Sequence, residues 1–320
     1  MHNNNRRDFI KKTGLATAIL GLGLGGQAIS MAPRKELFKI SLAQWSVNRL
    51  LFNKKMDNLD FAILAKKHGI SAVEYVNQFF MDKAKDRAYL KEMKTRAEGE
   101  GVTSVLIMCD NEGKLGARDQ SERMETVENH KKWVEAAKFL GCHSIRVNGY
   151  SFTRYSADKK DFAESQKLVA DGLRSLCEFA DTMDINVMIE NHGGFSSDAK
   201  WLSGVMKAAD HPRAGTLPDF GNFLMYRNEG EKTLSYDSYK GVKQLMPYAK
   251  GVSVKPTVWD GKGNQSQLDY EKMLSIVLKA GYHGYCGIEH GEQGRIWESI
   301  VEVREELEAA EKALRSSFSV

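Results

Sequence analysis

Three acidic residues stand where short apolar segments of this chain end. Glu190 follows INVMI, Asp219 follows AGTLP, and Glu289 follows YCGI. The carboxyl ends of parallel strands meet at one edge of a sheet or one mouth of a barrel, so the three carboxylates are expected to converge. Converging carboxylates repel one another unless positive charge lies among them. The pattern therefore predicts a divalent cation. Mg²⁺ or Mn²⁺ suits a carboxylate set best, and Zn²⁺ or Co²⁺ is the alternative if a histidine joins.

A plainer interpretation exists for the same residues. A single acidic side chain usually caps a helix or pairs with a nearby Lys or Arg. Three of them at the ends of separate strands favour the metal interpretation over this one.

The elements that would position these residues alternate along the chain. Short apolar runs followed by amphipathic helical patterns are typical of repeated βα units with a parallel sheet. We expect eight strands, at residues 38–46, 71–76, 102–110, 143–149, 185–191, 213–220, 249–256 and 285–290. Eight helices are expected, at residues 58–68, 84–100, 119–140, 161–181, 198–209, 236–248, 269–280 and 297–314.

Eight units leave no segment long enough for another domain, so a single (β/α)8 barrel over residues 36–320 is the economical closure. A doubly wound open sheet is the alternative, but no G-x-G-x-x-G opens a helix after the first strand. The loops that follow several strands are long, which indicates an active site at the C-terminal ends of the strands. Aromatic residues in these loops are expected to form apolar platforms above the barrel mouth: Tyr150, Phe152, Tyr155, Tyr226 and Trp259.

Four strand-end motifs, IENH, LPDFGN, VSVK and GIEH, resemble the sugar isomerase/epimerase superfamily of xylose isomerase-like barrels, which includes ketose 3-epimerases and inosose dehydratase. The resemblance extends from about residue 38 to the C-terminus. It implies that Glu190, Asp219 and Glu289 bind one divalent metal. The chain departs from the family at the seventh strand, where Ser253 stands in place of a frequent histidine ligand. A serine hydroxyl is a poorer ligand than imidazole, so metal binding is put in doubt, although His192 or His290 would be a substitute.

The resemblance also implies a mechanism, namely proton abstraction next to a carbonyl through an enediolate. Glu190 and Glu289 would handle protons on two sides of the substrate, and Lys255 would donate to the oxyanion. His192 would contact a hydroxyl, act as acid or base, or simply hold Glu190. Further contacts to sugar hydroxyls or ring faces are expected, each with an internal polar network or core packing as its alternative, from Glu74, Arg146, Asn148, Asn222, Trp45 and Trp259.

These features together predict an isomerase or epimerase of a non-phosphorylated carbohydrate or polyol. A keto-sugar lyase or dehydratase is one alternative, because its first step is the same. A non-catalytic sugar-binding barrel without metal is the other, and Ser253 keeps it open. A nuclease is disfavoured because the chain has only eight histidines and offers no histidine cluster. The sequence leaves homo-oligomerisation open.

The first thirty residues resemble a twin-arginine export signal. Arg6 and Arg7 precede Phe9, the apolar run LATAILGLGLGG and a stretch of small residues. An uncleaved membrane anchor is the alternative, but the run is short for a span of about 20 residues. We expect passage through the twin-arginine machinery to the periplasm. Cleavage would remove four basic residues and one acidic residue, which takes the net charge from +4 to about +1 and leaves no electrostatic support for nucleic-acid binding.

The four cysteines show no C-x-x-C spacing. They lie in or beside predicted core elements, so we expect buried thiols rather than disulfides or a zinc site.

Overall fold

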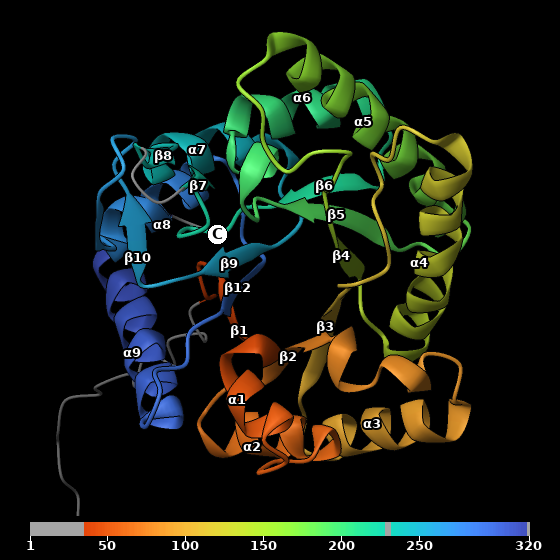
Figure 1. The fold of residues 1–320 in the computed structure, drawn as a ribbon. Coiled ribbons are helices and arrows are strands. Elements are labelled where there is room, and N and C mark those ends of the chain that lie inside the picture. Colours follow the sequence, from red (N-terminus) through yellow and green to blue (C-terminus); the bar gives the residue numbers. More distant parts are fainter. Residues whose placement is uncertain (1–34, 228–231, 319–320) are drawn as a thin grey trace, which may run out of the picture. The chain divides into compact units, whose positions relative to one another are not determined.

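Eight short parallel strands form one sheet in the order β6-β5-β4-β3-β2-β1-β12-β9. Bridges from Thr216 to Ala249 and from Asp219 to Ser253 join the two outer strands of this order and close the ring. The strands are β1 (Lys39–Ala43), β2 (Ala72–Val76), β3 (Thr103–Met108), β4 (Ser144–Asn148), β5 (Asn186–Glu190), β6 (Ala214–Leu217), β9 (Val252–Val254) and β12 (Tyr285–Ile288). The fold is the predicted (β/α)8 barrel (Figure 1).

The structure, a computed structural model, describes residues 35–227 and 232–318. Residues Glu36–Val320 form one compact unit. The export signal predicted at residues 1–30 lies outside the described residues and stays a prediction. Within the described ranges, no helix combines the length and the apolar character that crossing a membrane requires.

Helices surround the strands (Figure 1). They are α1 (Asn48–Phe52), α2 (Phe61–Lys67), α3 (Arg87–Gly99), α4 (Gln120–Leu140), α5 (Lys159–Asp181), α6 (Ala199–Ala209), α7 (Ser238–Leu245), α8 (Tyr270–Lys279) and α9 (Ile296–Leu314). Helices α3 to α8 all begin after an aspartate whose side chain accepts a hydrogen bond from the first turn, so the chain marks these starts locally. The caps are Asp86, Asp119, Asp158, Asp198, Asp237 and Asp269.

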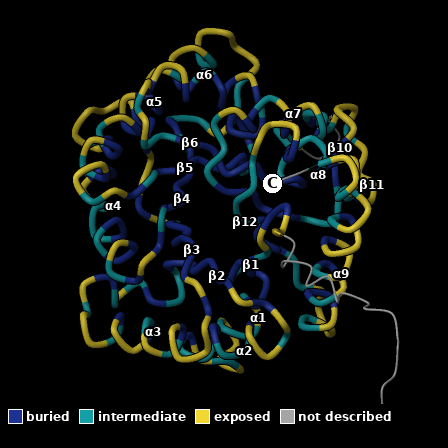
Figure 2. The backbone as a smooth tube through the Cα atoms, turned by 180° about the vertical axis from the view of Figure 1, so that it is seen from behind, coloured by how far each residue is buried: buried dark blue, intermediate teal, exposed yellow. Residues whose placement is uncertain are grey.

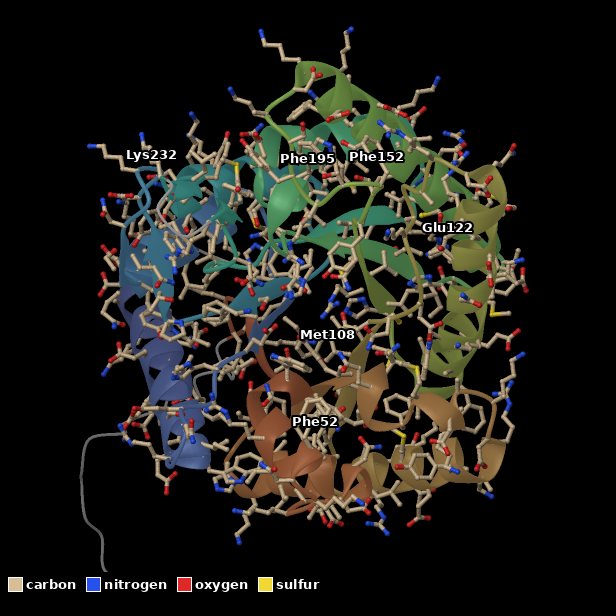
Figure 3. All side chains as sticks on the ribbon, in the orientation of Figure 1. Phe52, Met108, Glu122, Phe152, Phe195 and Lys232 are labelled. Atoms are coloured by element: carbon tan, nitrogen blue, oxygen red, sulfur yellow. The ribbon has the colours of Figure 1, made fainter. Side chains whose placement is uncertain are left out.

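The apolar core has two parts. A smaller cluster inside the ring includes Leu106, Met108 and Met188, and Figure 3 shows Met108 near the centre of the barrel. The larger cluster contains the other strand faces and the inner helix faces, for example Ile145 and Leu173. Figure 2 shows the strands buried at the centre and the exposed segments on the outer sides of the surrounding helices. All four cysteines are buried free thiols, as predicted.

Two hairpins are added to the eight βα units, and the sequence analysis treated both segments as loops. One consists of β7 (Leu224–Tyr226) and β8 (Leu234–Ser235), and the other of β10 (Thr257–Trp259) and β11 (Gln265–Gln267). They follow β6 and β9, and an antiparallel bridge between Asp237 and Asp260 links the segments that carry them. Figure 1 shows β7, β8 and β10 on one side of the barrel beside α7 and α8.

Candidate active site

The carboxylates of Glu190, Asp219 and Glu289 meet at the mouth of the barrel, as their spacing predicts. One oxygen of each lies within 4.8 Å of the others. Glu190 and Asp219 expose no surface, and Glu289 exposes 8%. Because three buried negative charges are costly without positive partners, the groups around them determine what the site can do.

Local hydrogen bonds orient Asp219. Its Oδ1 accepts from the backbone N–H groups of Gly221 and Asn222, both at 2.8 Å, in the turn that an aspartate before Gly and Asn favours. The side chain of Asn191 accepts from the Asp219 N–H at 2.8 Å and donates to the Asp219 carbonyl at 2.9 Å. Asp219 Oδ2 is thereby aimed into the cluster.

Lys255 lies between two of the carboxylates. Its Nζ is 2.5 Å from Asp219 Oδ2 and 2.6 Å from Glu289 Oε1. Burial alone would lower the pKa of Lys255, but Asp219 and Glu289 outweigh it and raise the pKa, so the group is an ammonium. Lys255, predicted from the sequence to donate to a substrate oxyanion, is also the positive charge nearest to the carboxylates.

Ser253, at the position of the frequent family histidine, also faces the cluster. Its Oγ donates to Asp219 Oδ2 at 2.9 Å and lies 3.4 Å from Glu289 Oε2. A hydroxyl has one proton and free lone pairs, so Ser253 adds a neutral oxygen to the three carboxylates.

Arg146 forms the second positive flank. Its Nη1 donates to Asp110 Oδ1 at 2.7 Å, and the same oxygen accepts from Asn148 Nδ2 at 2.8 Å. Arg146 Nε lies 2.9 Å from Glu190 Oε2, although the two atoms lack the alignment of a hydrogen bond. Asn222 Nδ2 donates to the other oxygen, Glu190 Oε1, at 2.9 Å.

Burial and charge act differently on the three carboxyl groups. Burial raises the pKa of Glu190 and of Asp219 above its ordinary value. Burial pushes the pKa of Glu289 in the same direction, but the Lys255 ammonium outweighs it and the pKa is lowered. Glu289 is therefore the carboxylate that keeps its charge most firmly at neutral pH.

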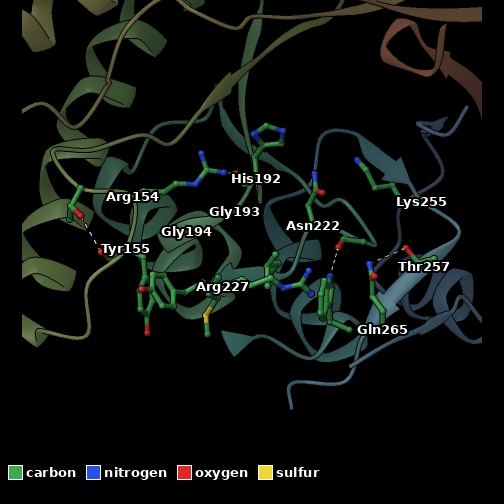
Figure 4. Close-up of a pocket in the computed structure, with 16 residues that line it drawn as sticks. Arg154, Tyr155, His192, Gly193, Gly194, Asn222, Arg227, Lys255, Thr257 and Gln265 are labelled. Carbon is green, nitrogen blue, oxygen red and sulfur yellow. Dashed lines mark hydrogen bonds between the residues drawn. The ribbon is translucent and has the colours of Figure 1, made fainter. Parts of the chain in front are cut away.

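Two cavities border the cluster. A smaller one of about 180 Å³ is lined by residues that include Trp45, Arg146, Asn148 and Glu289. A larger one of about 730 Å³ begins at His192, Asn222 and Lys255 and continues outward over the added hairpins (Figure 4). His192 borders both cavities.

His192 is held where the chain turns sharply. Its Nδ1 lies 3.2 Å from the Tyr150 hydroxyl, and burial lowers the pKa of His192 to about 4, so the ring is neutral at neutral pH. Gly194 follows with φ +63, and a Cβ there would lie 2.1 Å from the Arg154 carbonyl oxygen. The Gly-Gly pair after His192 therefore allows the loop that contains Arg154 to pack directly against the backbone of this turn.

Glu74 is the predicted hydroxyl contact that the structure places elsewhere. It is 1% exposed, lies beneath the mouth, and accepts from Ser41 Oγ at 2.6 Å. Gly287 makes room for it, because a Cβ at Gly287 would lie 2.3 Å from Glu74 Oε1. Burial raises the pKa of Glu74 to about 8. Glu74 is an internal group rather than part of either cavity lining.

The remaining predicted residues lie around the cavities. Trp45, Arg146 and Asn148 border the smaller one, and Asn222 and Trp259 border the larger one. His290, considered as a substitute ligand, is outside the close carboxylate group.

The sequence pattern did not predict site roles for Asn191 and Asp110. Asn191 lies inside the IENH motif, between Glu190 and His192. Asp110 directly follows a buried apolar run, the same signal that marked the three carboxylates.

Comparison with known proteins settles the family. Residues 63–316 match the model of the family described as "Xylose isomerase-like TIM barrel". The chain belongs to this family. An L-ribulose-5-phosphate 3-epimerase of Escherichia coli is 23% identical over 199 residues, which is 58% of this chain and 63% of that protein. The chain thus spans somewhat less than two thirds of the relative's length.

Solved structures of this fold agree. The 3-keto-D-glucoside 4-epimerase of E. coli has a TM-score of 0.61 at 14% identity, covering 86% of this chain and 100% of that one. A xylose isomerase-like TIM barrel protein from Mycobacterium smegmatis in complex with magnesium has a TM-score of 0.63 at 15% identity, covering 88% and 99%. At these identities the likeness shows the fold.

The donor atoms of this xylose isomerase-like barrel fit a divalent cation. Three carboxylates within 4.8 Å of one another could hold a metal ion, and Ser253 Oγ adds a fourth oxygen. Such a set suits hard cations. The Lys255 ammonium already contacts one oxygen of Asp219 and one oxygen of Glu289, so it competes with a metal ion for two of the three carboxylates.

Proposed function

We propose that this chain is a sugar isomerase or epimerase that removes a proton from the carbon next to a carbonyl. The observation that carries the proposal is the group of three converging carboxylates, with an ammonium among them, at the border of two cavities in a xylose isomerase-like barrel. The substrate is a non-phosphorylated carbohydrate or polyol derivative.

Glu289 is the base in this proposal. It borders the smaller cavity and is the carboxylate most firmly charged at neutral pH. The C–H bond next to the carbonyl breaks, its proton moves to Glu289, and its electron pair forms the C=C bond of an enediolate. The negative charge develops on the former carbonyl oxygen.

Lys255 borders the larger cavity and stabilises that oxygen. Its ammonium is fixed by two carboxylates before substrate arrives, so little reorganisation is required when the charge develops. Neutral His192, which borders both cavities, contacts a substrate hydroxyl.

Glu190 is the second proton-carrying group. It lies directly behind Asn222, which lines the larger cavity, and Arg146, which lines the smaller one. In the absence of a bound metal ion, burial raises the pKa of Glu190 to about 7, so the group can gain and lose a proton near neutral pH. A carboxyl group that carries a proton can return it to the enediolate, while one with a lowered pKa removes it.

The proposed cofactor is Mg²⁺ or Mn²⁺, with Zn²⁺ or Co²⁺ as the less suited alternatives, held by Glu190, Asp219 and Glu289. When bound, the ion would supply a second positive charge for the enediolate oxygens. We also propose a location for the protein. On the basis of the predicted twin-arginine signal, it is a periplasmic or otherwise exported enzyme.

One specific observation keeps a second candidate function. Lys255 forms ion pairs with Asp219 and Glu289, and Ser253 donates a hydrogen bond to Asp219. These two carboxylates therefore have partners without a metal, as they would in a non-catalytic sugar-binding barrel. A keto-sugar lyase is the third candidate, because it begins with the same proton removal.

The test has two parts. Elemental analysis of the purified protein measures bound metal, and NMR in D₂O measures deuterium uptake next to the carbonyl of free ketoses and ring-oxidised sugars. Uptake with retention of the sugar skeleton supports an isomerase or epimerase, and loss of water supports a lyase. No uptake on any sugar, with or without added Mn²⁺, would leave only the binding protein.

A further inference from the structure

The larger cavity extends well beyond the carboxylates. Its volume is about 730 Å³, room for roughly two dozen water molecules at ~30 Å³ each. This is about twice the number of non-hydrogen atoms in one hexose. In Figure 4, His192, Asn222 and Lys255 lie on one side of the cavity, and Tyr155, Arg227 and Gln265 lie on the other. A single sugar ring at Lys255 would leave the outer half empty.

Aromatic side chains line this outer half. The rings of Tyr155 and Tyr226 are stacked, with centroids 5.6 Å apart and an interplanar angle of 27°. Trp259 lines the same cavity, and the Arg227 guanidinium lies 5.4 Å from the centroid of its ring. Aromatic faces offer apolar contact area, and the C–H faces of sugar rings stack well on them.

The aromatic wall of Tyr155, Tyr226 and Trp259 has two members on strands, whereas Tyr155 lies in a segment without helix or strand. Tyr226 is on β7 and Trp259 on β10, so both belong to the hairpins added to the barrel. Trp259 donates from its backbone N–H to Ser238 Oγ and from its ring N–H to the Gly221 carbonyl, each at 2.9 Å. Gly221 is two residues from Asp219, so the same loop supports the wall and the carboxylate.

Polar groups stand beside the rings. Arg154, Thr257 and Gln265 line the same cavity, and Gln265 Nε2 is 3.5 Å from Thr257 Oγ1. Hydroxyls and amides next to aromatic faces match the alternating polar and apolar surface of a sugar ring.

We infer that the substrate carries a second ring, so that it is a glycoside or disaccharide rather than a free monosaccharide. The reacting ring lies against Lys255 and Glu289, and the second ring lies against the Tyr155–Tyr226 stack. This inference rests on the proposed function and adds the substrate class to it.

The chemistry of a glycoside restricts the reaction further. A glycoside, or a disaccharide that reacts at its nonreducing ring, holds the anomeric carbon of the reacting ring in an acetal, so that carbon cannot supply the carbonyl that proton removal requires. The carbonyl must be a ring ketone. An oxidoreductase that oxidises a secondary hydroxyl of the glycoside, with its own electron acceptor, must therefore act before this protein.

The test compares three substrates by deuterium uptake: a ring-oxidised disaccharide, the equivalent ring-oxidised methyl glycoside, and a ketose phosphate. We expect kcat/KM to be highest for the disaccharide. Tyr226→Ala should lower kcat/KM for the disaccharide roughly tenfold more than for the methyl glycoside, while Tyr226→Phe, which keeps the ring face, should retain activity. Tyr248→Ala, a half-buried tyrosine outside the cavity lining, is the matched control and should affect neither substrate.

Two results would overturn the inference while leaving the proposed function intact: equal kcat/KM for disaccharide and methyl glycoside, or an equal effect of Tyr226→Ala on both. A preference for the ketose phosphate would overturn both the inference and the non-phosphorylated substrate of the proposed function. A calorimetric titration with the unoxidised disaccharide tests the outer subsite without turnover. If the disaccharide binds and its binding weakens in Tyr226→Ala, the outer subsite is supported even when no sugar takes up deuterium. The absence of deuterium uptake in that case would contradict only the proposed function. Absence of any binding and any exchange would overturn both.

Discussion

Lys255 and Asp219 form a buried ion pair, with Nζ 2.5 Å from Oδ2, at the position that the sequence pattern assigns to a metal ion. Two consequences follow from this pair. The first is that the Lys255 ammonium partly neutralises the carboxylate cluster. The second is that a divalent cation can bind only if it displaces this ammonium or shares the carboxylate oxygens with it.

Replacing Lys255 with Met should therefore change stability and metal response together. The variant leaves buried carboxylates without their nearest cation, so the free energy of unfolding in metal-free buffer should fall by about 3 kcal/mol. Added Mn²⁺ should raise Tm more in Lys255→Met than in the unmodified protein, because the competing ammonium is gone. Thermal unfolding with and without Mn²⁺ measures both effects.

Lys250→Met is the control for that experiment. Lys250 is half-buried, and no ion pair is recorded for it among the described residues. Its replacement should leave the Mn²⁺ response unchanged. An equal Mn²⁺ shift in Lys255→Met and in the unmodified protein would show that ammonium and metal do not compete.

Asn191→Ala should destabilise the site through the backbone of Asp219. The change removes three hydrogen bonds to backbone groups, two of them to Asp219 and one to the Asn222 carbonyl, and should cost about 2 kcal/mol of unfolding free energy, with a loss of activity as Asp219 moves. Asn186→Ala, at the other end of β5, removes contacts in a partly exposed region and should cost less and spare activity. Denaturant unfolding and deuterium uptake compare the two variants. If the two variants lost equal amounts of unfolding free energy and of activity, Asn191 would have no special role in positioning Asp219.

Glu74→Gln should remove a pH dependence of stability. The pKa of Glu74 rises from 4.5 to about 8 in the folded chain, so the native state keeps a proton that the unfolded state has lost. The stability that this group contributes is complete below pH 4.5 and is lost as pH rises through 8. Unfolding curves should show the variant close to the unmodified protein at pH 4 and more stable at pH 9. If the difference in unfolding free energy between the two proteins were the same at pH 4 and pH 9, the raised pKa of Glu74 would not account for the pH dependence.

Gly194→Ala should be more harmful than an alanine at another left-handed glycine. Both Gly194 (φ +63) and Gly281 (φ +78) disfavour a side chain, but only at Gly194 does a Cβ meet an atom, the Arg154 carbonyl oxygen at 2.1 Å. We expect Gly281→Ala to cost about 1 kcal/mol and Gly194→Ala at least twice as much. Chemical denaturation measures the unfolding free energy of both variants. Similar losses of unfolding free energy would mean that the Arg154 loop moves away from the new Cβ at little energetic cost.

Much of the fold and the place of the site could be predicted from the sequence, because both depend on local patterns. Apolar runs and aspartate caps mark the strands and helices, and acidic residues at the ends of three strands mark the mouth. The two hairpins could not be predicted, because β11 is an exposed polar segment, QSQ, without apolar alternation, and its pairing with β10 is not local.

The contacts within the site were less predictable. Lys255 was expected to face substrate, and nothing in VSVK indicates that its ammonium would reach both Asp219 and Glu289. The alternation of strand residues does place Glu74 inside the barrel, but its depth beneath the mouth depends on the stagger of neighbouring strands. Such relationships are set by the packing of the whole barrel rather than by any segment.

The central claim is that the carboxylate cluster moves a proton next to a sugar carbonyl. Its most direct test is deuterium uptake from D₂O into a ring-oxidised disaccharide, followed by NMR, in the unmodified protein and in Glu289→Gln and Glu190→Gln variants that are checked for folding by circular dichroism. We predict uptake in the unmodified protein and a loss of at least 100-fold in each variant. Uptake that persists in both folded variants, or no uptake by the unmodified protein with Mn²⁺ present into this sugar or into any free ketose or other ring-oxidised sugar, would contradict the claim.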